Sequence, residues 1–420
     1  MSEVMTQKPL YTIPIVDRHD RGPWTSRIFF PIFFILAQLG INSVQFMSAP
    51  LLLVPFIGRR LFDNVIGWTK DGYARLLVAI TVLFAPTKLA ITSNSHPDLK
   101  ELVQYNDAGD IIKINLPDRL VVIANHQAYL DWIYIWILCV YAGHSRGLII
   151  LLKSSLKHIP VIGWGMRFFN FIFLKRSWAA DKDNLALALT QLGRKCRTDT
   201  GNLEISSLLP PKKRSPLWLL IFPEGTIVSD EERIKSIRYA EREGIDDYVT
   251  SLHPRSTGLL FCLRTLLQEI PDLQLLDLTI GYPGVPYEKY PQDWYGLSSV
   301  FLRSVPPPTV HIHLHLYSLS APDLKIPSLG TTADTPDNTG LSSNIGLATP
   351  QEARAFELWL RGLWDAKEKR MSNFYKEQQF ADHKSIIPIK QQHWYDWFSA
   401  IGGGGMATLI AFFAICYHFL

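Results

Sequence analysis

Short apolar runs that alternate with helical patterns constrain the fold of this chain more than any other feature, and they occupy residues 110–317. Each run has four to eight residues, and most are rich in Val, Ile, Leu and Phe, so all of them are predicted to be strands. The predicted strands are 120–124, 147–152, 171–174, 217–222, 275–282 and 310–317. Intervening stretches such as 132–141 and 181–194 have helical periodicity, so the sequence predicts an α/β domain with a central β-sheet flanked by helices.

A long apolar segment, residues 28–57, precedes this domain and exceeds the roughly 20 residues needed to cross a bilayer core. Charged residues make up only 19% of the chain and aromatic residues 12%, a balance that favours contact with lipid. Basic residues flank both ends, so two structures stay open: one tilted span, or a re-entrant hairpin that turns near residues 40–43. A second apolar stretch, 76–85, is too short to span and is expected to lie in the interface or to return the chain.

The last hundred residues have a different composition. Residues 318–350 are rich in Ser, Thr, Pro, Gly and Asp, which predicts a disordered loop. Thr349, Pro350 and Glu352 then form a capping-box pattern that predicts the start of a helix. An aromatic cluster, 394–398, and an apolar tail, 406–420, predict a C-terminal membrane anchor. The expected division is a polar tail 1–27, a membrane region 28–92, a catalytic domain 93–317, a disordered loop 318–350, a helical region 351–392 and an anchor 393–420.

Net charge and cysteine content exclude several classes of protein. A formal charge of +4 is small for 420 residues, so no nucleic-acid partner is expected, and basic clusters would instead meet anionic lipid headgroups. The four cysteines are far apart, without a C-x-x-C pair, which predicts neither disulfides nor a zinc site. The sequence predicts no particular oligomeric state.

Polar residues follow the predicted strand 120–124 and precede a predicted helix. Asn125 and His126 come first, and Asp131 opens the helix. A turn at this point brings His126 and Asp131 together, so that the carboxylate can fix the imidazole tautomer and leave the other ring nitrogen basic. Taken alone, the pattern also fits a plain helix cap at Asp131 beside an ordinary turn histidine.

A second polar group follows the predicted strand 217–222. Here Pro223, Glu224, Gly225 and Thr226 succeed one another. A carboxylate next to Pro and Gly at a strand end is suited to a hydroxyl-rich ligand, because glycine lets a substrate approach the backbone. A simple Pro-Gly turn is the alternative.

Together, the two blocks resemble the glycerophospholipid acyltransferase family of the 1-acylglycerol-3-phosphate type, whose signatures are N-H-x4-D and F-P-E-G. The run 171–176, which closes on Arg176, is similar to the family's second block, and residues 280–283 match a fourth block that leads to a proline. Residues 175–182 and 252–258 resemble the subgroup that reacylates lysocardiolipin and lysophosphatidylinositol. Ile227 departs from the arginine that many phosphatidic-acid-forming members have at this position.

The resemblance implies an acyl-CoA-dependent lysophospholipid acyltransferase. His126 would be the general base, oriented by Asp131, with no covalent acyl-enzyme intermediate. Substrate-binding roles are implied for Glu224, Gly225, Thr226, Arg176, Asn125 and Pro223. Acyl-CoA is a co-substrate, and neither a cofactor nor a metal is expected. Phosphatidylinositol or cardiolipin remodelling at the endoplasmic reticulum membrane is favoured, with the outer mitochondrial membrane or lipid droplets as alternative locations.

Three alternative functions stay open at this point. One is a 1-acyl-sn-glycerol-3-phosphate acyltransferase that makes phosphatidic acid, and another is a non-catalytic, lipid-binding relative. The third is a metal hydrolase, because His311, His313 and His315 alternate along a predicted strand and share one face.

Overall fold

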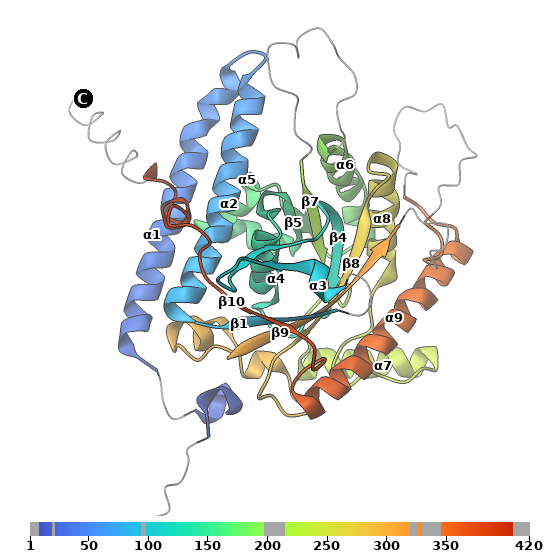
Figure 1. The fold of residues 1–420 in the computed structure, drawn as a ribbon. Helices are drawn as coiled ribbons and strands as arrows, with labels where there is room; N and C mark the ends of the chain where they lie inside the picture. Colours follow the sequence, from blue (N-terminus) through green and yellow to red (C-terminus); the bar gives the residue numbers. More distant parts are fainter. Residues whose placement is uncertain are drawn as a thin grey trace, which may run out of the picture.

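The computed structural model describes residues 8–18, 22–93, 98–196, 215–319, 326–329 and 346–405. An eight-stranded sheet forms its centre, in the order β10-β1-β9-β8-β4-β7-β5-β6 (Figure 1). The strands are β1 (Lys88–Ser93), β4 (Arg119–Ala124), β5 (Leu148–Lys153), β6 (Ile172–Leu174), β7 (Leu217–Ile221), β8 (Gln274–Gly281), β9 (Thr309–Ser318) and β10 (Ser385–Pro388). A separate pair consists of β2 (Val103–Tyr105) and β3 (Ile111–Ile114). The six predicted runs form β4 to β9, which confirms the predicted α/β fold.

Five neighbouring strands of the sheet, β8, β4, β7, β5 and β6, are parallel, so their carboxyl ends meet at one edge. On the other side of β8, β9 is antiparallel to it, β1 is parallel to β9, and β10 is antiparallel to β1. Both β4 and β7 are buried along their whole length, because helices cover both faces of the sheet. This two-sided burial is the reason for their uninterrupted apolar sequences.

The connecting helices lie on both faces of the sheet. Helices α4 (Asp131–Tyr141) and α5 (Ile162–Phe168) follow β4 and β5, whereas α6 (Trp178–Cys196) and α8 (Ser256–Glu269) lead back to β7 and β8. Crossovers between parallel strands are right-handed, so connections that run in opposite directions place their helices on opposite faces. Accordingly α4 packs against α2, and α6 packs against α8 (Figure 1). The remaining connections contain α7 (Asp230–Glu243) and α3 (Leu99–Leu102).

Two strands and one long helix outside residues 93–317 complete the catalytic unit. The sheet includes β1 and β10, which lie in segments expected to be membrane region and helical region. Helix α9 (Pro350–Glu377) packs against α8 and β8. The predicted capping box is present, since the Thr349 hydroxyl accepts from the Glu352 amide and the Glu352 carboxylate accepts from the Thr349 amide. Of the predicted loop, the structure describes 318–319, 326–329 and 346–350, and the other residues lie outside its description.

The N-terminal apolar region forms a helical hairpin, but its turn is not near residues 40–43, where one of the two structures left open by the sequence placed it. Helix α1 (Trp24–Ser48) continues through residues 40–43, residues 49–57 make the turn, and α2 (Gly58–Phe84) returns beside α1. Gly40 serves close packing instead, because a Cβ there would lie 2.3 Å from the backbone oxygen of Ile401. The stretch 76–85, predicted to lie in the interface or to return the chain, is largely the buried end of α2.

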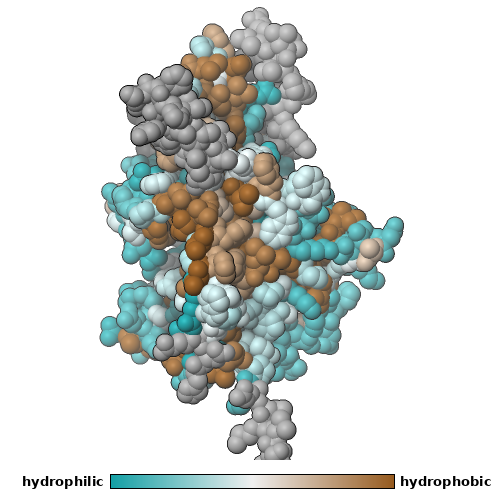
Figure 2. Space-filling model, turned by 90° about the vertical axis from the view of Figure 1, so that its left-hand side faces the viewer, coloured by the Kyte–Doolittle hydropathy of each residue, from teal (hydrophilic) through white to brown (hydrophobic). Residues whose placement is uncertain are grey.

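Helix α1 buries polar side chains and exposes apolar ones, which is the reverse of an ordinary surface helix. Its protein-facing side buries Gln38, Asn42 and Gln45, and Asn42 donates to the backbone oxygen of Val161 at 2.7 Å. Its outward side and the following turn expose large apolar residues: Ile28, Phe29, Ile32, Leu36, Phe46, Leu53, Val54 and Phe56. Figure 2 shows brown, apolar surface on the face of the molecule that carries the hairpin. A helix that turns apolar side chains outward is suited to lipid contact.

One helical stretch in the described part of the chain, Trp24–Leu53, is long and apolar enough to cross a membrane. The C-terminal aromatic cluster lies beside this hairpin, because α10 (Asp396–Ala400) packs on α2. Trp394, Tyr395 and Phe398 are exposed there. The predicted apolar tail, 406–420, lies outside the described residues.

Candidate active site

Most of the predicted site residues follow the carboxyl ends of the parallel strands and therefore lie at one edge of the sheet. His126 follows β4, Glu224 follows β7, and Tyr282 follows β8. Since β8, β4 and β7 are direct neighbours, their loops come into contact with one another. This edge forms the candidate active site.

The Asp131 carboxylate accepts four hydrogen bonds and so holds the loop after β4 in place. Its Oδ2 atom accepts from the His126 ring, with Nδ1 at 2.9 Å, and from the amides of Gln127 and Ala128 at 2.7 and 3.0 Å. Its Oδ1 atom accepts from the Tyr282 hydroxyl at 2.7 Å. Asp131 is also the first residue of α4, where the helix dipole favours a negative charge. The structure thus brings together the two residues predicted to act as a catalytic pair.

The His126 ring is held in place from a second direction. It stacks on Phe222, with ring centroids 4.0 Å apart and planes inclined by 16°. The side chain keeps 16% of its surface exposed, whereas Asp131 is fully buried. Because Nδ1 faces Asp131, Nε2 is the nitrogen opposite the carboxylate and is the one suited to exchange a proton.

Glu224 lies in the interior, 2% exposed, between the two motif loops. Its carboxylate accepts from the His126 amide at 3.3 Å, the Leu252 amide at 3.2 Å and the Trp364 indole at 3.3 Å. Burial raises the pKa of Glu224 to about 8, although these three donors oppose the shift. All of these contacts are to the protein itself, so a substrate-binding role for Glu224 stays a prediction.

The pH dependence of stability follows from this raised pKa. The folded chain holds the Glu224 proton up to about pH 8, whereas a carboxyl with the ordinary pKa of 4.5 releases it earlier in the unfolded chain. The stabilising contribution is therefore complete below pH 4.5 and is lost as the pH rises to about 8. We expect the Tm of the wild type to fall relative to that of Glu224→Gln as the pH rises from 4.5 to about 8. Thermal unfolding at several pH values measures it, and a difference that does not change with pH would contradict the assignment.

The other predicted binding residues take structural positions in the same loops. The Asn125 side chain pairs with the backbone of Ile280 on β8, donating at 3.0 Å and accepting at 2.8 Å. Gly225 adopts a φ of +78°, which glycine tolerates without strain. The Pro223 carbonyl accepts from the Arg255 amide at 2.8 Å, and Thr226 is half-buried. Their roles in binding substrate stay predictions.

Arg255 is the cation beside the second loop. It is exposed, and its Nε atom would lie 3.4 Å from a Cβ at Gly225. Ile227, where many phosphatidic-acid-forming members have arginine, is 7% exposed and so lies in the interior. The family resemblance singled out Ile227 and the run 252–258, which contains Arg255. Only the structure places Arg255 beside Gly225.

Arg176 lies at the same edge but apart from the catalytic pair. It follows β6, which is three strands from β4, or about 14 Å at about 4.8 Å per strand. Its loop is folded around Asp181, which accepts from the amides of Lys175 and Ser177 at 2.8 and 3.1 Å. Arg176 is exposed there, and its predicted role in substrate binding is untested by these contacts.

Sequence reasoning missed the contribution of α9 to the site. Trp364 bonds Glu224, and Lys367 donates to Asp277 Oδ1 and to the Leu278 carbonyl, both at 2.6 Å. The signal was available, because Lys367 is a charged residue within the apolar stripe of a predicted helix, and such a residue requires a buried partner.

The three histidines of β9 do not form a metal site in the described structure. His311 packs against Phe374, and His313 Nδ1 lies 3.0 Å from the Thr92 hydroxyl. Burial lowers the pKa of His311 to about 4 and that of His313 to about 3. Among the described residues, no group of three or more His, Cys, Asp or Glu side chains is arranged to hold a metal ion. The metal hydrolase alternative therefore gains no support from this strand.

Comparisons with known proteins agree with this geometry. The Acyltransferase family model matches residues 111–282. The chain is 31% identical to 2-acyl-1-lysophosphatidylinositol acyltransferase of Saccharomyces cerevisiae, over 74% of this chain and 75% of the relative. It is 28% identical to lysocardiolipin acyltransferase 1 of Danio rerio, over 82% and 70%. For probable 1-acyl-sn-glycerol-3-phosphate acyltransferase 5 of Arabidopsis thaliana the identity is 26%, over 73% and 64%. The chain belongs to the acyltransferase family, and the protein is an enzyme of that class.

Proposed function

We propose that the enzyme transfers a fatty acyl group from acyl-CoA to the free hydroxyl of a lysophospholipid, without a bound cofactor. The observation that carries this proposal is the His126–Asp131 contact of 2.9 Å at the carboxyl edge of the parallel strands. The relatives named for lysophosphatidylinositol and lysocardiolipin support the acceptor class.

The proposed mechanism uses His126 as a general base. Nε2 takes the proton of the acceptor hydroxyl while its oxygen bonds to the thioester carbonyl carbon, giving a tetrahedral intermediate. The intermediate collapses, the carbon–sulfur bond breaks, and CoA leaves as a thiol that recovers the proton from His126. Asp131 fixes the ring throughout, so no acyl group is bonded to the protein.

The proposed acceptor is a phosphodiester lysolipid such as lysophosphatidylinositol or lysocardiolipin. A phosphomonoester carries up to two charges and gains most from a cluster of guanidinium groups, whereas a phosphodiester carries one. Ile227 supplies no cation, and Arg255 is the exposed one beside Gly225. One arginine beside this loop matches the single charge of a phosphodiester better than the larger charge of a phosphomonoester.

The proposal includes attachment to the endoplasmic reticulum membrane, with the outer mitochondrial membrane or lipid droplets as alternative locations. The outward apolar side of α1 and the apolar turn, residues 52–57, support attachment to lipid. Helix α1 begins and α2 ends at the end of the hairpin opposite the apolar turn, and α2 leads directly to β1 of the sheet, which suits an enzyme whose acceptor lies in the bilayer (Figure 1).

A competition assay tests the function and the acceptor together. Purified full-length enzyme receives one acyl-CoA and equal amounts of lysophosphatidate, lysophosphatidylinositol and lysocardiolipin, and mass spectrometry measures the products. We expect a phosphodiester lysolipid to be used about fivefold better than lysophosphatidate, a difference of about 1 kcal/mol. The His126→Ala variant supplies the background. Preference for lysophosphatidate would refute the acceptor, and no transfer to any lysolipid would refute the function.

A further inference from the structure

Helix α9 lies outside the region that the family model matches, residues 111–282, yet it contacts the active-site loops. Three of its side chains face the strand ends. Trp364 bonds Glu224, Lys367 bonds Asp277 on β8, and the sulfur of Met371 lies 3.8 Å from the Asn125 amide nitrogen. The helix therefore packs directly against residues of the candidate active site.

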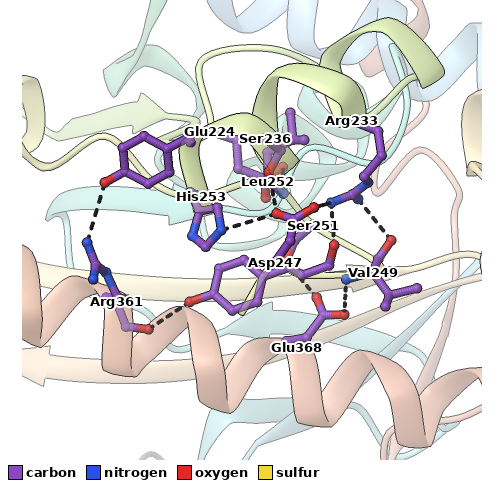
Figure 3. Close-up of polar contacts among 12 residues, drawn as sticks. Glu224, Arg233, Ser236, Asp247, Val249, Ser251, Leu252, His253, Arg361 and Glu368 are labelled. Carbon is purple, nitrogen blue, oxygen red and sulfur yellow. Dashed lines mark hydrogen bonds and ion pairs between the residues drawn. The ribbon is translucent and has the colours of Figure 1, made fainter. Parts of the chain in front are cut away.

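Glu368, on the same helix, uses both carboxylate oxygens on one short segment, residues 249–251 (Figure 3). Its Oε1 atom accepts from the Val249 and Thr250 amides, each at 2.8 Å. Its Oε2 atom accepts from the Thr250 and Ser251 hydroxyls at 2.7 and 2.8 Å. Four hydrogen bonds to one carboxylate fix both the backbone and the side chains of this segment.

The segment held by Glu368 in turn holds the two motif loops. The Thr250 carbonyl accepts from the Gln127 side chain at 2.9 Å, next to His126. The Leu252 amide donates to Glu224, which accepts from the His126 amide. Two hydrogen-bonded routes thus run from Glu368, one to Gln127, which follows His126 in the loop, and one to Glu224, which accepts from the His126 amide.

Neighbouring contacts attach the same loop to α9 and α7. Tyr248 donates to Asp365 of α9 at 2.6 Å, and Arg233 of α7 donates to the Val249 carbonyl at 2.9 Å. His253 Nε2 lies 3.1 Å from Asp247 Oδ1 (Figure 3). The Glu368 contacts include Thr250, whose carbonyl accepts from Gln127, and Ser251, which directly precedes the Leu252 amide that bonds Glu224.

We propose that Glu368 is a positioning residue for acyl transfer, acting through residues 249–252 on Glu224 and Gln127 and so on the placement of His126. This inference rests on the proposed general-base role of His126. Without the carboxylate, the segment loses its anchor and the imidazole is less well placed for attack. Misplacement by about 1 Å lowers turnover by up to about 10²-fold, and it acts on kcat more than on substrate binding.

The experiment compares three full-length variants well below their Tm values. Glu368→Ala is expected to lower kcat by about 10- to 100-fold with the KM for acyl-CoA changed less than about threefold. Glu368→Gln should recover to within about fivefold of wild type, because its amide oxygen still accepts from both backbone amides while the hydroxyls reorient. Arg264→Ala is the stability control, since it removes a partly buried ion pair between α8 and Glu352 of α9, away from the residues that Glu368 bonds.

The outcomes separate positioning from a loss of folding. Equal kcat in Glu368→Ala and wild type would overturn the inference, and so would a kcat loss in Arg264→Ala as large as that in Glu368→Ala. A Gln variant as impaired as the Ala variant would also overturn it. If Glu368→Ala does not fold, a Thr250→Val and Ser251→Ala double variant replaces it, with an expected kcat loss of about 3- to 10-fold. Full activity of His126→Ala would instead refute the general-base role of His126 on which this inference rests.

Discussion

Replacing His126 with alanine is expected to lower kcat by about 10²–10⁴-fold while leaving Tm nearly unchanged. The ring lies in a loop, its side chain is partly exposed, and its main contacts are Asp131 and Phe222. Loss of a general base accounts for the rate, and loss of one stacked ring has little effect on folding. Initial rates with saturating acyl-CoA and lysolipid, together with thermal unfolding, measure both.

The control for this variant is His383→Ala, which removes an exposed histidine that does not belong to the motif loops. It should retain wild-type activity. Asp131→Asn tests whether Asp131 has to fix the orientation of the His126 ring. An amide cannot accept hydrogen bonds from all four groups that donate to the carboxylate. A His126→Ala enzyme with more than about a tenth of wild-type turnover would exclude the general-base role.

Replacing Lys367 with alanine is expected to lower the free energy of unfolding by about 3–5 kcal/mol. Lys367 is fully buried, its ammonium group lies 2.6 Å from Asp277 Oδ1, and it also donates to Leu278 and Thr279. Burial lowers the Lys367 pKa, and the Asp277 carboxylate opposes that shift. Removing the lysine leaves Asp277 charged and poorly paired in the interior, which is more costly than losing the pair as a whole.

Chemical denaturation measures this effect, and two further variants interpret it. Lys369→Ala, two residues further along α9 and exposed, should change the free energy of unfolding by less than about 0.5 kcal/mol. A Lys367→Met and Asp277→Leu double variant should recover most of the lost stability, because it removes both charges and keeps the volume. Equal stability of Lys367→Ala and Lys369→Ala would show that the buried pair has no such role.

Strands in the middle of the sheet could be predicted from the sequence because burial on both faces makes the sequence of a strand almost entirely apolar. A strand such as β7 has helices on either side, so each of its residues is apolar and the run ends where the polar motif begins. For the same reason His126 and Glu224 were expected at strand ends, where a parallel sheet gathers its loops. The sequences of β4 and β7 do not show that the two strands are neighbours, although it is this pairing that brings the two loops into contact.

The hairpin shows how a local signal was misread. Gly40 and its polar neighbours looked like a turn, since glycine and small polar residues are common in turns. In the structure the glycine admits the backbone of Ile401 from the far end of the chain, and the polar side chains bond protein groups such as Val161. Contacts between segments so distant in sequence decide this meaning, and no window around Gly40 contains them.

By itself, the amino-acid sequence determined the α/β class, six of the strands, the capped helix at Thr349 and the pair of residues, His126 and Asp131, on which the proposed chemistry depends. Each of these follows from local periodicity, capping or a short motif. Only the tertiary structure decided that Glu224 is an interior residue, that Tyr282 bonds Asp131 and that α9 holds the active-site loops. These facts depend on strand order and helix docking, which are set by non-local burial and by pairing of buried polar groups.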